Sequence, residues 1–426
     1  MEKQNRDSYI NMVSVWCRTY NHKDYIRDAL EGLVSQETNF AYEVIVFDDA
    51  STDGTSDIVR EYEARYPEII HAIISDENIY RRSDGMEIAW RIWQKYLTGK
   101  YLAFCEGDDF WIDRNKLQIQ VDYMESHPEC SMYMHNALWL NCQNGSIKAG
   151  NPFRGNVEGD VAAEELIMQY NSYPSTASFL FRREQIDKPQ FFRDSPAEDY
   201  ATILFALSTG KVYYSSRIMS VYRVFANGSF AVRMQRMNQV RLRFYMKLLT
   251  FYRKYDKYTD YKYHVWISKR IACCDLAIMY GCEPDRSITE YVRSSEEPGD
   301  ALPVEIWEYI EGLEERRSQE MPDELRAFVS KYKHIIIMGT GEFGTYAARQ
   351  LINHHVEFDG FAVTARTDEE MQFMEKKIYE LSKLPYDKKQ TGVIVGICPY
   401  SGKWRWDSVL KSLEGAEISN YYCPFS

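Results

Sequence analysis

The fold is decided by the stretch Val44-Ile45-Val46-Phe47-Asp48-Asp49-Ala50-Ser51-Thr52-Asp53-Gly54-Thr55. Its four apolar residues are typical of a buried β-strand, and the acids and small residues after them are typical of a turn that leads into a helix. Short apolar runs at Met12–Cys17 and Ile69–Ile74 lie before and after it, and amphipathic, helix-like segments separate the three. This alternation predicts an α/β fold with a parallel sheet.

A second acidic turn, Glu106-Gly107-Asp108-Asp109, follows the expected strand Tyr101–Cys105. Because the carboxyl ends of parallel strands meet at one edge of a sheet, this turn is expected to lie close to Asp48-Asp49. Carboxylate oxygens bind Mg²⁺ or Mn²⁺ together with substrate phosphates and water. The alternative is that the acids cap the helices that follow them, since an Asp before a helix accepts backbone N–H bonds.

The composition indicates a folded chain of two or three domains. The 426 residues are 45% hydrophobic and 15% aromatic, which is typical of globular proteins. No run of about 18 apolar residues predicts a membrane-spanning helix, and the polar first nine residues do not resemble a secretory signal. The nine cysteines form no CxxC pair and are expected to be reduced thiols. We therefore expect a cytoplasmic protein.

The formal net charge of −12 argues against a nucleic-acid partner. The charge is nevertheless uneven, because residues 211–270 contain fourteen Lys or Arg and only two acids. Such a stretch is either a solvated helical face or a surface for anionic lipid head groups or a diphosphate acceptor. A peripheral contact with the inner face of the membrane through residues 211–270 is therefore one expectation.

A second α/β unit is expected near the C-terminus. The apolar run His334–Met338 leads into Gly339-Thr340-Gly341-Glu342-Phe343-Gly344, which has the GxGxxG spacing of turns that bring a phosphate to a helix N-terminus. The glycines of this turn are Gly339, Gly341 and Gly344. The next expected strand ends at Thr364-Ala365-Arg366 without an acid for a ribose hydroxyl, which disfavours NAD(P). We expect a docking or nucleotide-sensing module.

The chain is thus expected to have three parts. Residues 10–230 hold the first α/β domain. Residues 231–332 form a helical extension and linker, rich first in Arg, Met and Tyr and then in acids. Residues 333–426 form a small Rossmann-like α/β domain.

Three motifs, taken together in this order, resemble glycosyltransferase family 2. They are Val13-Ser14-Val15-Trp16-Cys17-Arg18-Thr19-Tyr20-Asn21, Phe47-Asp48-Asp49-Ala50-Ser51-Thr52-Asp53-Gly54-Thr55 and Glu106-Gly107-Asp108-Asp109. The resemblance covers roughly residues 10–230. It implies a GT-A domain, which is the fold of nucleotide-diphospho-sugar transferases, with a nucleotide-sugar donor, expected to be UDP-linked, and a Mn²⁺ or Mg²⁺ ion.

The resemblance also implies a role for each matching residue of the donor site. The turn Thr19-Tyr20-Asn21 would lie against the nucleotide, and Asp49 would recognise the base with Asp48 beside it. Asp108 would lie near the ribose or the sugar. Asp109 would be the principal metal ligand.

Four further residues complete the expected site. Asp199 stands where the family often has a general base, which would take the proton from the acceptor hydroxyl; the alternative is that it caps the helix after it. Phe225 stands where relatives often have His, so that no His ligand is expected there. Arg223 is expected either to contact the diphosphate or to form a structural ion pair. Arg82 is assigned to donor binding by its place in the chain.

One base, one metal ion and no second nucleophilic carboxylate favour a single displacement with inversion at the anomeric carbon. The sequence therefore predicts transfer of a sugar from a nucleotide sugar to a glycan or lipid-linked acceptor in bacterial surface polysaccharide synthesis. Two alternatives stay open. One is a catalytically silent protein that binds a sugar nucleotide or serves as a scaffold, and the other is a bifunctional chain with a C-terminal NAD(P)-dependent activity.

Overall fold

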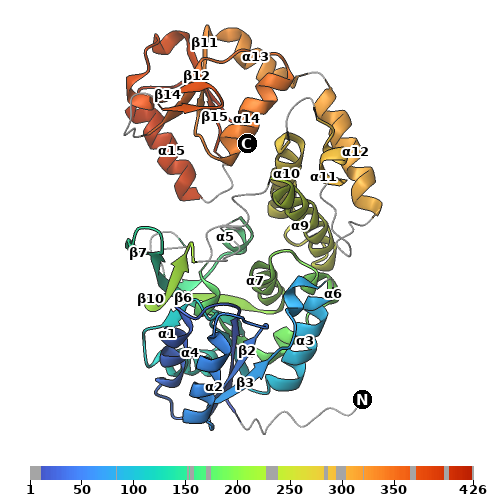
Figure 1. Ribbon diagram of the computed structural model, residues 1–426. Coiled ribbons are helices and arrows are strands. Elements are labelled where there is room, and N and C mark those ends of the chain that lie inside the picture. Colours follow the sequence, from blue (N-terminus) through green and yellow to red (C-terminus); the bar gives the residue numbers. More distant parts are fainter. Residues whose placement is uncertain are drawn as a thin grey trace. The chain divides into compact units, whose positions relative to one another are not determined.

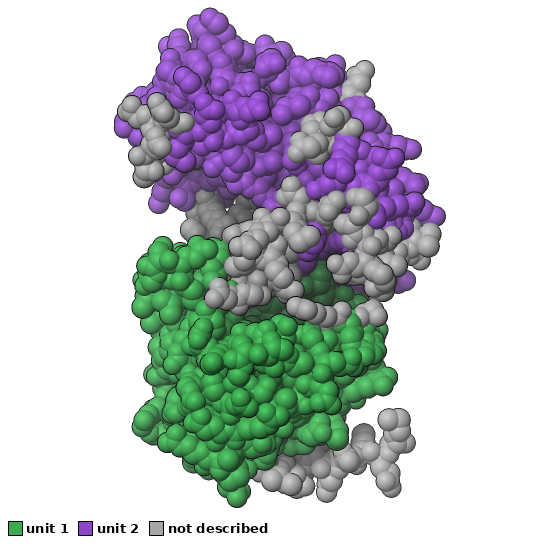
Figure 2. All heavy atoms as spheres, in the orientation of Figure 1, with its two compact units in different colours: residues 1–166, 172–235 green, residues 167–171, 236–426 purple. Residues whose placement is uncertain are grey.

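The computed structural model describes residues 11–82, 84–150, 153, 158–168, 174–226, 238–282, 286–293, 304–319, 321–364, 371–397 and 403–424. The chain forms two compact units, which are coloured separately in Figure 2. Unit 1 contains residues 1–166 and 172–235, and unit 2 contains residues 167–171 and 236–426. The predicted Ala365 and Arg366 lie outside the described residues.

Unit 1 is built on a ten-stranded sheet with the strand order β3-β2-β1-β4-β9-β6-β10-β5, to which β7 and β8 are added beside β6 and β10. Its strands are β1 Val13–Thr19, β2 Tyr42–Asp48, β3 Ile70–Ile74, β4 Tyr101–Phe104, β5 Phe110–Trp111, β6 Cys130–Asn141, β7 Ile147–Ala149, β8 Gly159–Asp160, β9 Leu180–Arg182 and β10 Lys211–Val224. Strands β3, β2, β1 and β4 are parallel. The α/β class predicted from the sequence is therefore confirmed.

The helices of unit 1 cover both faces of this sheet. They are α1 Ile26–Val34, α2 Thr55–Arg65, α3 Gly85–Tyr96, α4 Lys116–Ser126, α6 Gln190–Arg193 and α7 Glu198–Thr209, and the boundary between the units crosses α5 Ala163–Met168. Figure 1 shows α1, α2 and α4 on one side of the sheet and α3 on the other. One core joins α1, α2 and α4 to the sheet, and a second core joins α3 and α7 to it. Strands buried on both faces explain why β1, β2 and β4 read as apolar runs.

A fully buried lysine, Lys116, lies at the start of α4 in unit 1. Its Nζ donates to Gln120 Oε1 at 2.7 Å and lies 3.8 Å from the centre of the Trp111 ring. Burial lowers the pKa of the Lys116 ammonium to about 7. Between about pH 7 and the ordinary pKa of lysine, the Lys116 amine is therefore less protonated in the folded protein than in the unfolded chain.

We expect this lysine to make the fold more stable as the pH rises above 7. The unfolded chain binds more protons in that interval, so the free energy of unfolding rises by up to about 1.4 kcal/mol per pH unit from this group. Lys116→Met should remove that part of the rise. Thermal unfolding of both proteins at pH 7 and pH 9 measures it, and an equal increase in the wild type and the variant would contradict the expectation.

Unit 2 combines helices with a second, six-stranded sheet of order β13-β14-β12-β11-β15-β16. The helices are α9 Asn238–Tyr258, α10 His264–Tyr280, α11 Ile288–Arg293, α12 Val304–Ser318, α13 Asp323–Lys331, α14 Glu342–Asn353 and α15 Lys403–Gly415. The strands are β11 His334–Met338, β12 Gly360–Val363, β13 Gln372–Phe373, β14 Lys376–Glu380, β15 Thr391–Val395 and β16 Tyr421–Tyr422. All pairs are parallel except β13 with β14, which is compatible with a Rossmann-like arrangement.

The helical part of unit 2 packs directly on its sheet domain. Arg349 Nη1 on α14 donates to the carbonyl oxygen of Tyr280 at 3.0 Å, and Asn353 Nδ2 donates to the carbonyl oxygen of Arg317 at 2.7 Å. These bonds join α14 to the ends of α10 and α12. Within the described ranges, every helix of the chain is too short or too polar to cross a lipid bilayer.

Candidate functional site

The two acidic turns lie at one edge of the unit 1 sheet, on either side of β1. Thr19 pairs with Asp48 at the end of β2, and Trp16 pairs with Phe104 at the end of β4. The turns are also bonded to the end of β1: the Asp49 N–H donates to the Thr19 carbonyl at 3.0 Å, and the Gly107 N–H donates to the Arg18 carbonyl at 2.8 Å. The sheet order β2-β1-β4 thus brings the sequence-predicted acids to a common edge.

The turn after β1 is held to the turn after β2 by side chains. The Asn21 N–H donates to Ser51 Oγ, and the Thr52 N–H donates to Asn21 Oδ1, both at 2.8 Å. Asn21 and Ala50 have φ values of 53° and 63°. These values lie in the left-handed region, which residues other than glycine seldom adopt. Strained residues of this kind often gather at functional sites, where surrounding contacts hold them in place.

Asp49 is buried, and its carboxylate binds the segment that follows β3. Oδ1 accepts from the Ile79 N–H at 2.6 Å and Oδ2 accepts from the Tyr80 N–H at 3.3 Å. Burial raises the pKa of Asp49 despite these bonds. Each oxygen keeps one further lone pair, which a nucleotide base would have to use. The neighbouring Asp48 accepts from the Ser51 N–H at 3.0 Å and from the Ser56 hydroxyl.

Asp109 has one buried oxygen without a partner. The residue is 1% exposed, and its Oδ1 accepts from the Arg223 N–H at 2.8 Å. Its Oδ2 has no hydrogen-bond partner among the residues that the structure describes. Burial, and then the charge of Asp108, raise the pKa of Asp109 well above its ordinary value. Burying a charged oxygen without a partner costs free energy. A bound cation or a hydrogen-bond donor at this oxygen would remove that cost.

A divalent cation fits this oxygen. In the described ranges no group of three or more His, Cys, Asp or Glu side chains is placed to hold a metal ion by itself. Mg²⁺ commonly takes one or two carboxylates and completes its shell with substrate phosphates and water. Asp109, with Asp108 next to it in the chain, supplies a donor set of that kind.

Gly107 allows the acidic turn to lie directly on the turn after β1. A Cβ at this position would stand 2.7 Å from Thr19 Oγ1 and 3.0 Å from His22 Nδ1. Both atoms are buried and, within the described parts of the chain, have no hydrogen-bond partner. Three polar atoms thus lack partners around the same turn, which is an arrangement that a polar ligand could satisfy.

Arg223 holds the acidic turn instead of facing solvent. Its Nη1 donates to the Asp108 carbonyl at 2.7 Å, and its Nη2 pairs with the Asp28 carboxylate. The guanidinium also lies 4.6 Å from the centre of the Phe110 ring. These contacts favour the structural ion pair, which was the alternative to a diphosphate contact. Phe225, just after β10, has a φ of 62° and so ends the strand in a strained conformation.

Asp199 is the second residue of α7, in the first turn of the helix. The N-cap position is Ala197, so Asp199 does not cap the helix. One of its oxygens accepts from the Tyr200 N–H at 2.8 Å. Burial raises the pKa of Tyr222, and the charges of Asp109, Glu106, Asp108 and Asp199 raise it further. Asp199 and the acidic turn are therefore both close enough to Tyr222 to act on it by charge.

The structure adds an ionic network that the sequence prediction missed. Arg18 Nη2 pairs with Glu106 Oε1 at 2.5 Å, and its guanidinium lies 4.4 Å from the centre of the Tyr80 ring. Glu198 acts on Arg18 by charge, and burial raises the pKa of Glu198 while the nearby Lys188 lowers it. The sequence feature that could have indicated this network is Arg18, a single charged residue in the apolar strand β1.

Arg82 lies on the surface of unit 1. Its guanidinium pairs with Glu77 at 2.7 Å and with Asp84 at 2.8 Å. Neither partner belongs to the acidic turns. The expected donor contact of Arg82 stays a prediction.

The Gly-rich turn of unit 2 has the backbone that its glycines suggest. Gly339 has a φ of 105°, and a Cβ on Gly344 would stand 2.2 Å from the Gly339 carbonyl oxygen, so the turn requires both glycines. Gly341 caps α14. The first residue of α14, Glu342, accepts from the Tyr245 hydroxyl at 3.0 Å and pairs with Arg241 at 3.3 Å. A carboxylate of the chain itself thus lies at the helix end that would attract a phosphate.

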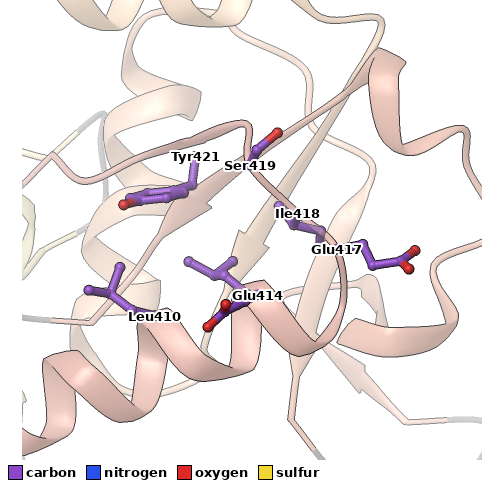
Figure 3. A pocket seen from close by; sticks show the side chains of 7 residues that line it. Leu410, Glu414, Glu417, Ile418, Ser419 and Tyr421 are labelled. Carbon is purple, nitrogen blue, oxygen red and sulfur yellow. The ribbon is translucent and has the colours of Figure 1, made fainter.

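A hollow of about 440 Å³ lies elsewhere in unit 2, between α15 and β16. Figure 3 shows Leu410, Glu414 and Tyr421 around it. Its other lining residues come from the same segment of the chain. None of the acids of the unit 1 edge takes part.

Comparison with known proteins finds a family similarity in the first part of the chain. Residues 14–160 match the family model described as Glycosyl transferase family 2. This range includes Asp48-Asp49 and Asp108-Asp109, but it ends before Asp199 and Arg223.

Two relatives show how far the similarity extends. An uncharacterized protein of Mycobacterium tuberculosis is 32% identical over 216 residues, which are 51% of this chain and 60% of that protein. The chain thus spans well under two thirds of that relative's length. TuaG of Bacillus subtilis, a glycosyltransferase named for teichuronic acid biosynthesis, is 28% identical over 221 residues, which are 51% of this chain and 80% of TuaG.

Two solved glycosyltransferase structures are similar at a lower level. TarS residues 1–349 of S. aureus, in complex with UDP-GlcNAc, has 16% identity and a TM-score of 0.41, over 73% of this chain and 93% of that one. The mannosyltransferase PcManGT of Pyrobaculum calidifontis, with GDP-Man and Mn²⁺, has 18% identity and a TM-score of 0.41, over 72% of this chain and 85% of that one. Both TM-scores are below 0.5. The residues of unit 1 that are similar to the family, 14–160, thus include both acidic turns of this edge.

Proposed function

We propose that this chain is an inverting, divalent-metal-dependent glycosyltransferase. It transfers a sugar from a nucleotide sugar, expected to be UDP-linked, to a hydroxyl of a glycan or lipid-linked acceptor in bacterial surface polysaccharide synthesis. The observation that carries the proposal is the buried Oδ2 of Asp109, which has no hydrogen-bond partner among the described residues. The name of the relative TuaG, which refers to teichuronic acid biosynthesis, motivates the class of acceptor.

The donor would bind at the carboxyl ends of β2, β1 and β4. Asp109 would hold the cation, which supplies charge stabilisation to the departing diphosphate. The unpartnered Thr19 Oγ1 and His22 Nδ1 lie beside the same turn and can hydrogen-bond to the donor. Arg223 keeps the turn in place through the Asp108 carbonyl and the Asp28 carboxylate.

Asp199 would act as the general base. It lies in the first turn of α7, and a carboxylate in this position could take the proton from the acceptor hydroxyl. Its neighbour Glu198 is surrounded by the cations Lys188 and Arg18 and is better suited to positioning. With one base and no nucleophilic carboxylate opposite it, displacement would occur in one step with inversion.

The acceptor would approach along the ends of β6 and β10. Trp139 and Tyr222 pair across these strands, and their rings lie edge to face with centroids 6.2 Å apart. Both side chains are partly exposed. Aromatic rings of this kind offer an apolar surface with a polar edge, which suits the face of a sugar ring.

The proposal is tested first by donor binding. A ligand that binds the folded state raises the temperature of unfolding, so we expect UDP-sugars to raise the melting temperature by several degrees with Mn²⁺ and by much less with EDTA. Released UDP, measured with a mixed glycan acceptor, would then report transfer. Stabilisation by NADH in place of UDP-sugars would contradict the proposal and would favour the NAD(P)-dependent alternative.

A further inference from the structure

The turn between α9 and α10 exposes apolar and aromatic side chains. Tyr258 is 44% exposed, Tyr261 is 58% exposed and Val265 is 63% exposed. No other stretch of eight residues, within the ranges that the structure describes, exposes more than one large apolar or aromatic side chain. A concentration of this kind on a surface indicates an interaction site.

The same turn carries exposed positive charge. Lys254, Lys257 and Lys262 are exposed around it, and Asp260 is the exposed acid among them. The other acid, Asp256, is buried and accepts from His264 Nδ1 at 2.7 Å. We name Lys254, Lys257, Tyr258, Tyr261, Lys262 and Val265 the turn patch.

Other cations of the basic stretch predicted from the sequence are engaged inside unit 2. Arg241 pairs with Glu342, as described above. The Arg253 guanidinium lies 3.7 Å from the centre of the Tyr309 ring, and Arg270 Nε donates to the Tyr252 hydroxyl at 3.0 Å. In unit 2, the basic stretch therefore contains arginines that contact their own unit and exposed lysines at the turn.

The turn has a defined backbone that presents these side chains outward. The Asp260 N–H donates to the Lys257 carbonyl at 3.1 Å, and the Tyr261 N–H donates to the Asp256 carbonyl at 2.9 Å. Asp260 and Tyr261 have φ values of 49° and 58°. Two consecutive left-handed residues other than glycine are unfavourable, and local bonds hold them in place. Tyr261 is thereby kept at the exposed tip of the turn.

We propose that the turn patch docks unit 2 on an anionic lipid surface. Tyrosine prefers the membrane interface, where its ring meets acyl chains and its hydroxyl meets water. Lysines near the surface are attracted to anionic head groups, and a few exposed apolar side chains insert among them. A protein interface is the poorer fit, because the buried centres of such interfaces are depleted in lysine.

The negative net charge of the chain should orient the protein on an anionic surface, with the turn patch facing the lipid. The formal net charge is −12, so an anionic surface repels most of the molecule. Only a local cationic site can be attracted to it. Tyr258 of the turn patch and Tyr245 are thirteen residues apart on α9, or about 20 Å, so that the turn can reach the surface while Glu342 and its partners stay away from it.

The experiment measures partitioning of the full chain onto lipid vesicles. Wild-type protein is sedimented with vesicles of phosphatidylcholine alone and with vesicles that contain phosphatidylglycerol. We expect binding to the anionic vesicles that weakens with salt, a fall of about tenfold or more in the partition coefficient for Lys257→Glu/Lys262→Glu, and a smaller fall for Tyr261→Ala. Thermal unfolding confirms that the exposed substitutions leave the fold intact.

The matched control is Lys389→Glu/Lys411→Glu. It changes the net charge by the same amount at exposed lysines on the sheet domain of unit 2, and it should leave partitioning nearly unchanged. The proposal is overturned if wild-type protein does not sediment with anionic vesicles, or if the control loses as much binding as the turn variant. Self-association or packing on unit 1 that Lys257→Glu/Lys262→Glu disrupts, without vesicle binding, would likewise overturn it. Sugar transfer to a detached acceptor does not depend on this result.

Discussion

Asp109→Asn is expected to abolish sugar transfer while making the protein more stable. Asparagine keeps an oxygen that can accept from the Arg223 N–H, which Asp109 Oδ1 accepts at 2.8 Å. It removes the charge that would hold the cation. Loss of that charge stabilisation should lower the transfer rate by about 10³-fold or more. It should also abolish the effect of Mn²⁺ on donor binding.

The gain in stability follows from the burial of Asp109. Burial raises its pKa in the folded protein well above the ordinary value. A raised pKa means that stability is lost as the pH rises from the unfolded pKa through the folded one, so at neutral pH the ionised side chain destabilises the fold. Removing it should raise the melting temperature in the absence of metal. Sites tuned for function often show this exchange between stability and activity.

Three measurements check this prediction together. They are released UDP, donor binding with and without Mn²⁺, and the melting temperature without metal. Asp122→Asn, an exposed acid of α4, is the control and should change none of them. Transfer within about tenfold of wild type in Asp109→Asn would remove the assignment of the metal ligand.

Asp199→Asn is expected to lose transfer by a different route. The amide oxygen can still accept from the Tyr200 N–H, which Asp199 binds at 2.8 Å, so the start of α7 should stay as it is. The side chain can no longer take a proton from the acceptor. General-base catalysis commonly contributes about 10²- to 10⁴-fold, and a loss in that range is expected. Donor binding and its dependence on Mn²⁺ should persist.

The contrast between the two variants is the sharper test. Asp194→Asn, an exposed acid that precedes the same helix, serves as the control and should transfer at the wild-type rate. If Asp199→Asn loses donor binding as well as transfer, then Asp199 belongs to the donor site and another group is the base. Glu198, which follows Ala197 in the same turn, would be the next candidate.

The acidic edge of the unit 1 sheet could be predicted because its signal is local. Each acidic turn directly follows an apolar strand in the sequence, and parallel strands place their carboxyl ends together. The strand predicted at Val44–Phe47 lies within β2, and the strand predicted at Tyr101–Cys105 is confirmed as β4, which ends at Phe104. The roles assigned to Asp49 and Asp109 stay predictions.

The contacts that lock the edge could not be predicted, because they join distant residues. The backbone of Arg223 reaches Asp109 across 114 positions, and the Arg223 side chain reaches Asp28 across 195. The length of strand β10, Lys211–Val224, is also not evident from the sequence. Its register shifts around Ser215 and Ile218, where polar residues interrupt the apolar pattern.

Unit 2 shows the same limit. The glycines of its turn were visible in the sequence, and β11 is confirmed at His334–Met338. That Tyr245 would bind Glu342 depends on a contact across 97 positions. The GxGxxG motif alone could not predict these contacts, because Tyr245 and Arg241 lie on α9, outside the motif. The division of the chain at 230 and 332 stays a prediction.

The bonds from α14 to the ends of α10 and α12 have a practical consequence for dissecting this protein. Deleting only the sheet domain would strip Tyr280 and Arg317 of partners and leave an apolar helical surface open to aggregation. Separate expression of the two halves should therefore place the boundary in the stretch between Ala226 and Asn238. A cut there keeps α10, α12 and α14 in one fragment, while residues 167–171 of unit 2 stay with the other fragment.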